Sequence, residues 1–326
     1  MSKLITEKKI RIEIPPAKTK ERIDLFLTNS LENATRTKVQ KLIEAGFVLV
    51  NGKPTKANYK ILPFDLLDIT IPISPRPEKA EPEDIPLDIV FEDDYLIVVN
   101  KPAGMVAHPA YSNYTGTLVN ALLHHTNKLS KLNEPEIRPG IVHRIDKNTS
   151  GLLLVAKDEY VHAQLAKQFS KHTVEREYWA IAWGKFKSPK GEITLNIARS
   201  KTDRKKFTHT DSNEGKTAIT FYEVILEYDF TSLVKLNLKT GRTHQIRVHL
   251  AAINHPIFGD PVYGGRAILY GHKLPKIKSR VENLLEEMPR QALHAKTLGF
   301  IHPKTKESLR FDSDLPEDMK NILTRL

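Results

Sequence analysis

Apolar and polar positions along the chain repeat with the periods of strands and helices. Alternating or continuous apolar runs predict strands at residues 65–69, 89–91, 96–99, 152–156, 219–224 and 232–238. Apolar residues three or four apart predict an amphipathic helix after Gly116-Thr117 and a second one capped by Asp158. Because strands and helices do not alternate regularly, the pattern predicts an α+β fold with a mixed, largely antiparallel central sheet.

The first part of the chain has a pattern of its own. Residues 22–27 predict a short helix, and Thr35 is placed to cap a second one that Gly46 ends. A strand at residues 47–50 runs into Asn51-Gly52, a strong signal for a tight turn. We therefore predict a small helix pair beside a small sheet. The predicted boundaries are an N-terminal extension over residues 1–17 and a domain over residues 18–72.

Prolines separate this module from the rest of the chain. Residues 71–88 read IPISPRPEKAEPEDIPLD and hold five prolines among acidic residues. Proline removes backbone donors and stiffens the chain, so we predict a linker over residues 73–86. The larger domain would then span residues 87–326, and two domains fit a chain of 326 residues.

The charge balance favours an acidic partner. Lysine and arginine number 50 against 39 aspartates and glutamates, a formal net charge of +11. Nucleic acid is the first candidate for such a partner, although a merely lysine-rich protein would show the same excess. In the helix expected after Thr35, Arg36, Lys38 and Lys41 lie off the apolar face. These three residues are candidate contacts to an RNA backbone, and a solvated helix face is the alternative.

Several classes of site and location are not expected. The chain has no cysteine, which excludes disulfides, thiolate catalysis and cysteine-ligated zinc. His244 and His249 are five residues apart without an acidic cluster, so no metal site is expected. Gly215-Lys216-Thr217 lacks the earlier glycine of a phosphate-binding loop, and no nucleotide cofactor is indicated. Without a signal-like N-terminus or a long apolar run, we expect a cytoplasmic protein with no membrane contact.

Candidate chemistry gathers in a few segments of the larger domain. They are NKPAG at 100–104, HRIDKNTSG at 143–151, REYWA at 176–180 and TGRTHQIRVHL at 240–250. A lone aspartate such as Asp146 is most often a cap or one side of a structural ion pair. The neighbouring motifs change this reading, because Arg144, Tyr178 and Arg247 add the charge and aromatic surface suited to a nucleotide. A carboxylate held by arginine keeps a low pKa and stays anionic, as a nucleophile or base requires.

Both modules resemble known families. Residues 20–70, with their leading RID, the TRTKVQKLI helix and the VNGK turn, resemble an S4 RNA-binding domain. Residues 88–315 resemble the RluA family of pseudouridine synthases, whose motifs follow here in order through NHPIFGDPVYG at 254–264 and LHAKTLGFIHP at 293–303. The combination is most similar to the branch that modifies large-subunit ribosomal RNA, the D type. Ile145 stands where this family usually has leucine, a change that preserves the apolar character.

The resemblance implies a role for each candidate residue. Asp146 would be the catalytic carboxylate, acting either as nucleophile at C1′ or as base at C2′. Tyr178 would stack on the target base and Arg247 would pair with Asp146. Arg144 would fill the stack that the flipped uridine leaves, and Arg242 and His244 are further expected RNA contacts. Lys101 and Pro102 would support the active-site loop, and no metal or cofactor would be needed.

The prediction from sequence is therefore an RNA pseudouridine synthase that flips and isomerises specific uridines. Large-subunit (23S) ribosomal RNA is the expected substrate, either free or in a pre-ribosomal particle, and the protein is expected to be a monomer. A synthase acting on tRNA and a non-catalytic ribosome-assembly factor are alternatives. A base hydrolase, in which water intercepts a glycosyl intermediate, is a third.

Overall fold

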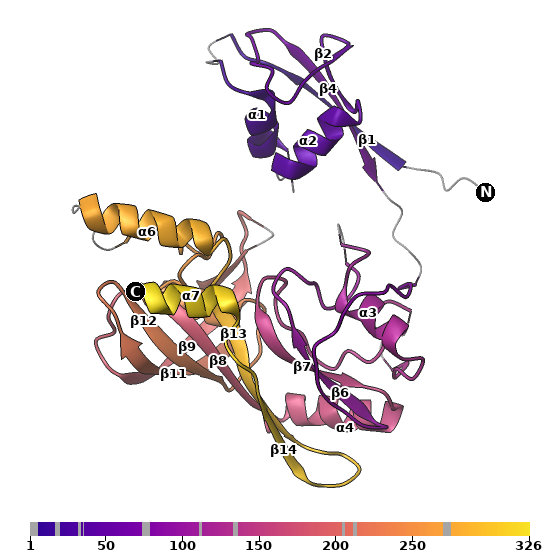
Figure 1. Ribbon diagram of the computed structural model, residues 1–326, viewed down its shortest axis with the longest axis vertical. Coiled ribbons are helices and arrows are strands. Elements are labelled where there is room, and N and C mark those ends of the chain that lie inside the picture. Colours follow the sequence, from indigo (N-terminus) through magenta and orange to yellow (C-terminus); the bar gives the residue numbers. More distant parts are fainter. Residues whose placement is uncertain are drawn as a thin grey trace. The chain divides into compact units, whose positions relative to one another are not determined.

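The computed structural model describes residues 6–16, 20–31, 34, 36–73, 79–110, 113–132, 136–203, 206–210, 214–269 and 275–326 (Figure 1). The chain divides into two compact units, residues 1–77 and 78–326. Each unit has a hydrophobic core of its own, as expected for two domains. The predicted α+β class with a largely antiparallel sheet is confirmed.

The N-terminal unit is a small sheet with two helices. Its strands are β1 (Thr6–Glu13), β2 (Val48–Val50), β3 (Lys53–Pro54) and β4 (Leu66–Ile73), in the order β1-β4-β2-β3. Its helices are α1 (Ile23–Ser30) and α2 (Arg36–Glu44), and both predicted helices are confirmed. The turn between β2 and β3 is also confirmed, since Asn51 and Gly52 both have positive φ, 51° and 75°.

One boundary in this unit differs from the prediction. Residues 1–17 were predicted as an extension, whereas β1 pairs with β4 in register from Thr6–Ile73 to Glu13–Leu66. Ile10 and Ile12 pack against the core of this unit, so β1 is an integral part of the sheet. The alternation in TEKKIRIE is the pattern of a half-buried strand. The cap predicted at Thr35 lies outside the described residues.

The larger unit is built on one extended sheet. Its strands are β5 (Ile89–Glu92), β6 (Leu96–Lys101), β7 (Ser150–Ala156), β8 (Glu175–Trp183), β9 (Lys190–Arg199), β10 (Phe207–Thr210), β11 (Lys216–Glu227), β12 (Thr231–Leu238), β13 (Leu293–Ile301) and β14 (Ser308–Asp312). Their order is β10-β9-β11-β12-β8-β13-β7-β6-β5, and β14 pairs with β13. The β13–β7 pairing is parallel and extends over two residue pairs, His294–Ser150 and Ala295–Gly151. The other pairings between these strands are antiparallel.

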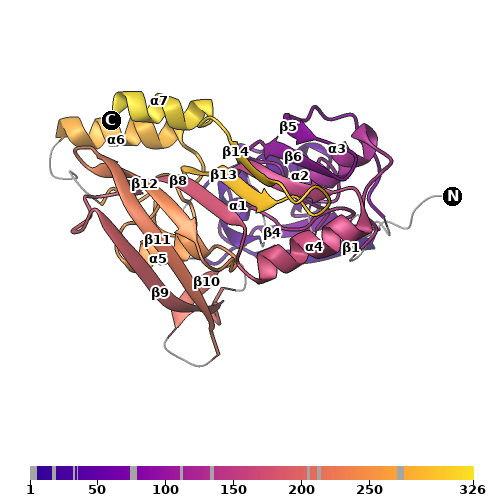
Figure 2. The same cartoon turned by 90° about the horizontal axis from the view of Figure 1, so that it is seen from below.

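The helices of this unit cover both faces of the sheet. They are α3 (Leu118–His125), α4 (Glu159–Ser170), α5 (Gln245–Ala252), α6 (Pro275–Glu287) and α7 (Glu317–Arg325). Alternate residues of β7 face opposite ways: Leu153 belongs to the same cluster as α3, whereas Leu154 belongs to the same cluster as α4. The cap predicted at Asp158 is confirmed, because its carboxylate accepts from the N–H of Val161 at 2.8 Å. Helices α6 and α7 lie side by side, away from α4 (Figure 2).

The second half of the predicted linker is not a free tether. The N–H of Ala80 donates to the carbonyl of Glu136 at 2.6 Å, and the N–H of Glu83 donates to the carbonyl of Asn120 at 2.9 Å. The side chain of Asn120 in turn donates to the carbonyl of Glu81 at 2.6 Å. These hydrogen bonds hold this acidic segment along the start of α3, inside the second unit.

The segment around Asp146 is flanked by a strand on one side only. The strand predicted at residues 152–156 is confirmed as β7, on the C-terminal side of Asp146. On the N-terminal side a single bridge joins Ile141 to Val155, and residues 142–149 form a loop. Asp146 lies in this loop and lines a cavity.

Candidate active site

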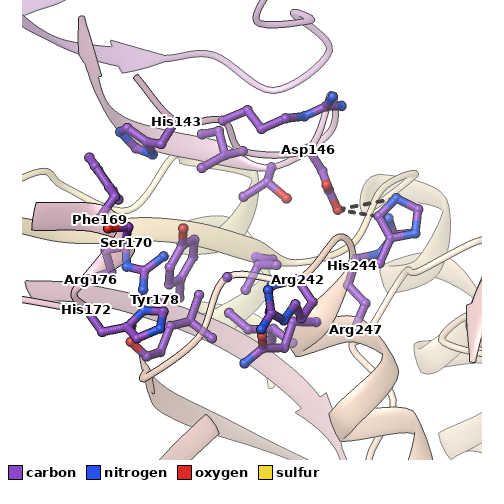
Figure 3. Close-up of a pocket in the computed structure, with 18 residues that line it drawn as sticks. His143, Asp146, Phe169, Ser170, His172, Arg176, Tyr178, Arg242, His244 and Arg247 are labelled. Carbon is purple, nitrogen blue, oxygen red and sulfur yellow. Dashed lines mark hydrogen bonds and ion pairs between the residues drawn. The ribbon is translucent and has the colours of Figure 1, made fainter. Parts of the chain in front are cut away.

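One cavity gathers most of the residues that the sequence analysis singled out. Its volume is about 410 Å³. The residues that line it are His143, Arg144, Ile145, Asp146, Thr149, Phe169, Ser170, His172, Arg176, Tyr178, Leu238, Gly241, Arg242, His244, Gln245, Ile246, Arg247 and Leu293. They come from the loop before β7, the end of α4 and the residues after it, the start of β8, the end of β12 and the turn after it, helix α5 and the start of β13. Figure 3 shows Asp146 and His244 across the cavity from Tyr178.

Asp146 has one close partner and remains open to the cavity. Nη1 of Arg247 donates to Oδ2 of Asp146 at 3.1 Å. The side chain of Asp146 is 21% exposed, whereas that of Arg247 is 6% exposed. The carboxylate is therefore oriented by one arginine and keeps lone pairs directed at whatever enters the cavity.

A second carboxylate, that of Asp260, fixes the orientation of Arg247. Its Nε and Nη2 donate to Oδ2 and Oδ1 of the fully buried Asp260, at 2.7 and 2.9 Å. Oδ1 of Asp260 also accepts from the N–H groups of Val262 and Tyr263. Burial opposes the charge of Arg247, but its hydrogen bonds and ion pairs with Asp260 and Asp146 outweigh burial and raise its pKa. A permanently charged, geometrically fixed guanidinium thus faces Asp146.

His244 ends a short hydrogen-bonded chain and lies close to Asp146. The hydroxyl oxygen of Tyr263 accepts from the N–H of Phe207 at 3.0 Å and lies 2.8 Å from Nδ1 of His244. We assign the hydroxyl hydrogen to the bond with Nδ1, which places the imidazole hydrogen on Nε2. Nε2 lies 3.8 Å from Oδ2 of Asp146. Burial lowers the pKa of His244, although Asp146 acts in the opposite direction, so the ring is neutral near pH 7.

Lys101 ties the loop of Asp146 to the neighbouring NKPAG turn. Its ammonium donates to the carbonyls of Pro102, Met105 and Lys147 at 2.7, 2.8 and 3.2 Å. The carbonyl of Lys147 also accepts from the N–H of Gly104 at 2.8 Å. Burial, followed by the charge of Arg290, lowers the pKa of Lys101 to about 7, while Asp146 opposes this shift. Three carbonyl acceptors match the three hydrogens of the protonated amine, which fixes the backbone next to Asp146.

Two further residues support the same loop from the C-terminal part of the chain. Nη1 of Arg290 donates to the carbonyl of Asn148 at 3.0 Å, and the side chain of Gln291 donates to the hydroxyl of Thr149 at 3.2 Å. Arg290 itself is held by Asp318 of α7 through bonds of 2.7 and 2.8 Å. The loop is therefore anchored on both sides, and its geometry does not depend on local sequence alone.

The aromatic side of the cavity is centred on Tyr178 of β8. The Tyr178 side chain is buried, and burial raises the pKa of its hydroxyl. Phe169 stacks on His143 with ring centroids 4.4 Å apart. Burial, followed by the charge of Arg176, lowers the pKa of His143 to about 3. Nε2 of His143 accepts from the N–H of Leu154 at 2.9 Å, so this histidine is a neutral structural residue.

The predicted RNA contacts occupy two places. Arg144 and Arg242 are exposed and line the cavity, and the guanidinium of Arg242 donates to the carbonyl of Thr217 at 3.2 Å. Arg36, Lys38 and Lys41 are exposed on α2 of the N-terminal unit. Arg36 also has a structural partner, because its Nε donates to Asp24 at 3.1 Å.

Several residues of this site were not singled out from the sequence, among them Asp260, Tyr263 and Arg290. Asp260 and Tyr263 stand in NHPIFGDPVYG, and Arg290 stands just before LHAKTLGFIHP. The motifs were visible as patterns, but nothing local identifies which charged residue faces Arg247 or the loop of Asp146. Along the chain, Asp260 is 13 residues from its partner Arg247, and Arg290 is 142 residues from its partner Asn148.

Within the described ranges, no group of three histidine, aspartate and glutamate side chains is arranged to hold a metal ion. The described helices include none that is long and apolar enough to cross a membrane. The cavity instead combines one oriented carboxylate, an aromatic ring and several cations. This combination suits an anionic, aromatic substrate such as a nucleotide of RNA.

Known proteins share both units. The RNA pseudouridylate synthase family matches residues 95–252, and the S4 domain matches residues 21–67. An RNA pseudouridine synthase of Chlorobaculum parvum is 49% identical over 320 residues, which cover 97% of each chain. The chain belongs to the RNA pseudouridine synthase family. The synthase is therefore an isomerase that acts on RNA, with an S4 domain ahead of its catalytic domain.

Other relatives agree with this assignment. The ribosomal large subunit pseudouridine synthase D of Zymomonas mobilis is 44% identical over 310 residues, 94% of the synthase and 93% of the relative. Among solved structures, the human RNA pseudouridylate synthase domain containing 4 aligns with 73% of the synthase and 92% of its own chain. That alignment has a TM-score of 0.55 and 26% identity. The predicted family, fold and enzyme class are thus confirmed.

Proposed function

We propose that the synthase isomerises uridines of large-subunit ribosomal RNA with Asp146 as its catalytic residue. The observation that carries this proposal is the pairing of Asp146 with Arg247 at the wall of a cavity that Tyr178 also lines. Support for the substrate comes from relatives in Zymomonas mobilis and Neisseria meningitidis named ribosomal large subunit pseudouridine synthase D. The S4 domain supplies a second RNA-binding surface.

The chemistry requires only one carboxylate at the sugar. Asp146 either attacks C1′ or takes a proton from C2′, and in both routes the electron pair of the N1–C1′ bond leaves with the base. The detached uracilate turns about its N3–C6 axis, and C5 forms the new bond to C1′. C5 then loses its hydrogen, N1 gains one, and Asp146 returns to its starting state. Arg247 would keep the carboxylate aimed at the sugar throughout.

The target uridine must leave the RNA stack before this reaction. A stacked nucleotide hides its glycosidic bond, and extruding it costs a few kcal/mol. Tyr178 offers a ring on which the extruded base would stack, and Arg144 is exposed beside the cavity, where it would take the place of the base. Contacts of Arg242 and of the exposed cations on α2 to phosphates would offset the remaining energy of extrusion.

The direct test is tritium release from RNA that carries 5-³H-uridine. Wild type should release tritium from large-subunit rRNA, free or in pre-ribosomal particles, and Asp146→Asn should release none. The same assay on tRNA decides the class of RNA. Release from tRNA alone would contradict the ribosomal assignment, and free uracil without tritium release would indicate a hydrolase. No product from any of these RNAs would favour a non-catalytic binding factor.

A further inference from the structure

Arg176 is a half-buried cation that lines the cavity and has no carboxylate partner among the described residues. The described residues place no aspartate or glutamate within ion-pairing distance of its guanidinium. Nη2 makes one long contact, 3.4 Å, with the carbonyl of Leu238, and Nε is buried with no hydrogen-bond partner among the described residues. Arg247, which lines the same cavity, has two carboxylate partners. A charge that is partly removed from water and unpaired is destabilising, so its presence in a site calls for an anionic ligand.

Arg176 lines the cavity, where a ligand has space, and its neighbours restrict the position of its side chain. Its guanidinium lies 5.7 Å from the centre of the Phe169 ring. Nη1 lies 2.8 Å from the point where a Cβ on Gly241 would sit, so any larger residue at 241 would displace it. Burial lowers the pKa of Arg176, while the neighbouring Tyr178 opposes the shift.

The position of Arg176 favours the base over a phosphate as its ligand. Arg176 and Tyr178 are two residues apart on β8, so they share one face of the strand about 7 Å apart. Figure 3 shows both on the side of the cavity opposite Asp146. A base that stacks on Tyr178 with its sugar toward Asp146 would present its carbonyl edge to this side. Phosphates stay at the mouth, where Arg144 and Arg242 are exposed.

We propose that Arg176 is a catalytic residue that binds a uracil carbonyl oxygen and stabilises the negative charge the base gains when the N1–C1′ bond breaks. This inference rests on the proposed function. The electron pair of that bond spreads over N1, O2 and O4 of the free base. Turning the base about its N3–C6 axis exchanges O2 and O4. A fixed guanidinium would therefore face an equivalent acceptor before and after the turn, and the anion would stay bound while C5 approaches C1′.

The test compares Arg176→Met with wild type in single-turnover tritium release at saturating RNA. Removal of an unpaired, partly buried charge should leave thermal stability unchanged or higher. RNA affinity should change less than about threefold, whereas the rate should fall about 100-fold, as when one donor to a developing anion is lost. Arg242→Met is the matched control, with weaker RNA binding and a smaller salt dependence. A rate that recovers at high RNA concentration, or does not fall, would overturn the role of Arg176.

A second substrate separates catalysis from a purely structural effect. Fluorine at C5 stabilises the free base as an anion, so RNA with 5-fluorouridine at the target should need Arg176 less. Nuclease digestion and chromatography measure the rate at which the fluorinated nucleoside is converted. In Arg176→Met this rate should fall by a smaller factor than the rate of tritium release from ordinary RNA. An equal loss for both substrates would contradict the proposal. Arg176→Gln, which removes the charge and keeps a polar side chain, gives the same comparison if the methionine variant is unstable.

The outcome also distinguishes this inference from the function on which it rests. If wild type releases no tritium from any RNA, the proposed function fails and the role of Arg176 fails with it. If wild type is active and Arg176→Met is equally fast at saturating RNA, only the role of Arg176 fails.

Discussion

The tripeptide Arg-Ile-Asp occurs twice in this chain, with opposite outcomes. In the S4 domain, Asp24 is fully buried and accepts hydrogen bonds from Arg22, Arg36 and Gln40 at 2.9 to 3.1 Å. In the catalytic domain, Asp146 is 21% exposed and has Arg247 as its hydrogen-bond partner, at 3.1 Å. The isoleucine is buried in both.

The difference lies in how many lone pairs the protein uses. Around Asp24 the fold supplies donors for both oxygens, so the carboxylate is a structural centre that joins α1 to α2. Hydrogen bonds from Arg22, which outweigh burial, together with those from Gln40 and Arg36, lower the pKa of Asp24. Around Asp146 the fold fixes the orientation with one arginine and leaves the rest of the carboxylate open to the cavity. The unused hydrogen-bonding capacity is what supports the catalytic role proposed for Asp146.

The largest expected effect comes from substituting Asp146, the aspartate to which we assign the catalytic role. Asp146→Asn should lower the rate of tritium release by about 10⁴-fold or more, because the amide is neither a nucleophile nor a base. Its melting temperature should stay within about 2 °C of wild type, since the residue is partly exposed. Single-turnover kinetics and calorimetry measure the two quantities. A rate close to that of wild type would remove Asp146 from the mechanism.

Arg247→Met should damage both activity and stability. The buried Asp260 would lose its bidentate partner, so the free energy of unfolding of the catalytic domain should fall by about 4 kcal/mol. Asp146 would lose its orientation as well, and we expect at least about a 10³-fold lower rate. Denaturant unfolding and tritium release report the two effects. The double variant Arg247→Met/Asp260→Leu should recover stability but not activity, and recovery of both would show that Arg247 is purely structural.

Asp24→Asn is the matched control for Asp146→Asn in the S4 domain. Charge-assisted bonds from two arginines would weaken, and the free energy of unfolding of this domain should fall by about 3 kcal/mol. RNA affinity should fall with it, while the unfolding transition of the catalytic domain should not move. Two-transition calorimetry and RNA binding test this expectation. A wild-type S4 transition in this variant would mean that the buried network contributes little.

The smallest expected effect is a difference between the two domains in how their stability depends on pH. All 13 histidines lie after residue 77, and burial lowers the pKa of His249 to about 4. The unfolded chain then binds more protons than the folded one between pH ~6.5 and ~4, so the catalytic domain should lose stability as pH falls through this window. The S4 domain has no histidine, and the stability from Asp24 is present above pH ~4 and lost only below it.

His249→Leu provides the control for this pH effect. His249 is fully buried with both ring nitrogens unpartnered in the described structure, so leucine removes the group that must become charged. The substitution changes the free energy of unfolding at each pH, and this change should be about 2 kcal/mol more favourable at pH 4.5 than at pH 7.5. Urea unfolding at the two pH values measures the difference. Equal changes at both values would contradict a titrating His249.

The sequence predicted the parts of this protein that depend on local pattern. Periodicity predicted the helices that contain Val39 and Val161 and most strands of the large sheet. The motifs singled out Asp146, Tyr178 and Arg247, which line one cavity. The strand β1 was missed because its partner β4 lies about sixty residues later in the chain, and a short alternating run gives no hint of that pairing. Even the tripeptide shared by Asp24 and Asp146 looks the same in sequence.

Long-range geometry is what the sequence could not supply. Asp260 and Arg290 act on the site through contacts with Arg247 and with the loop of Asp146, and no local signal distinguishes them from surface charges. The unpaired state of Arg176 is likewise visible only when its neighbours in space are known. Burial and the number of partners decide which charge is structural and which is free to react.

The short parallel pairing between β7 and β13 has a consequence for when the catalytic domain can fold during synthesis. Ser150 and His294, joined by a hydrogen bond of 2.9 Å, are 144 residues apart, and Arg290 reaches the loop of Asp146 across a similar separation. Contacts so distant along the chain form late, since a large loop must close first. During synthesis we expect the S4 domain to fold first and the loop of Asp146 to reach its final geometry last. A ribosome must therefore add Arg290 and His294 to the chain before the cavity around Asp146 can be completed.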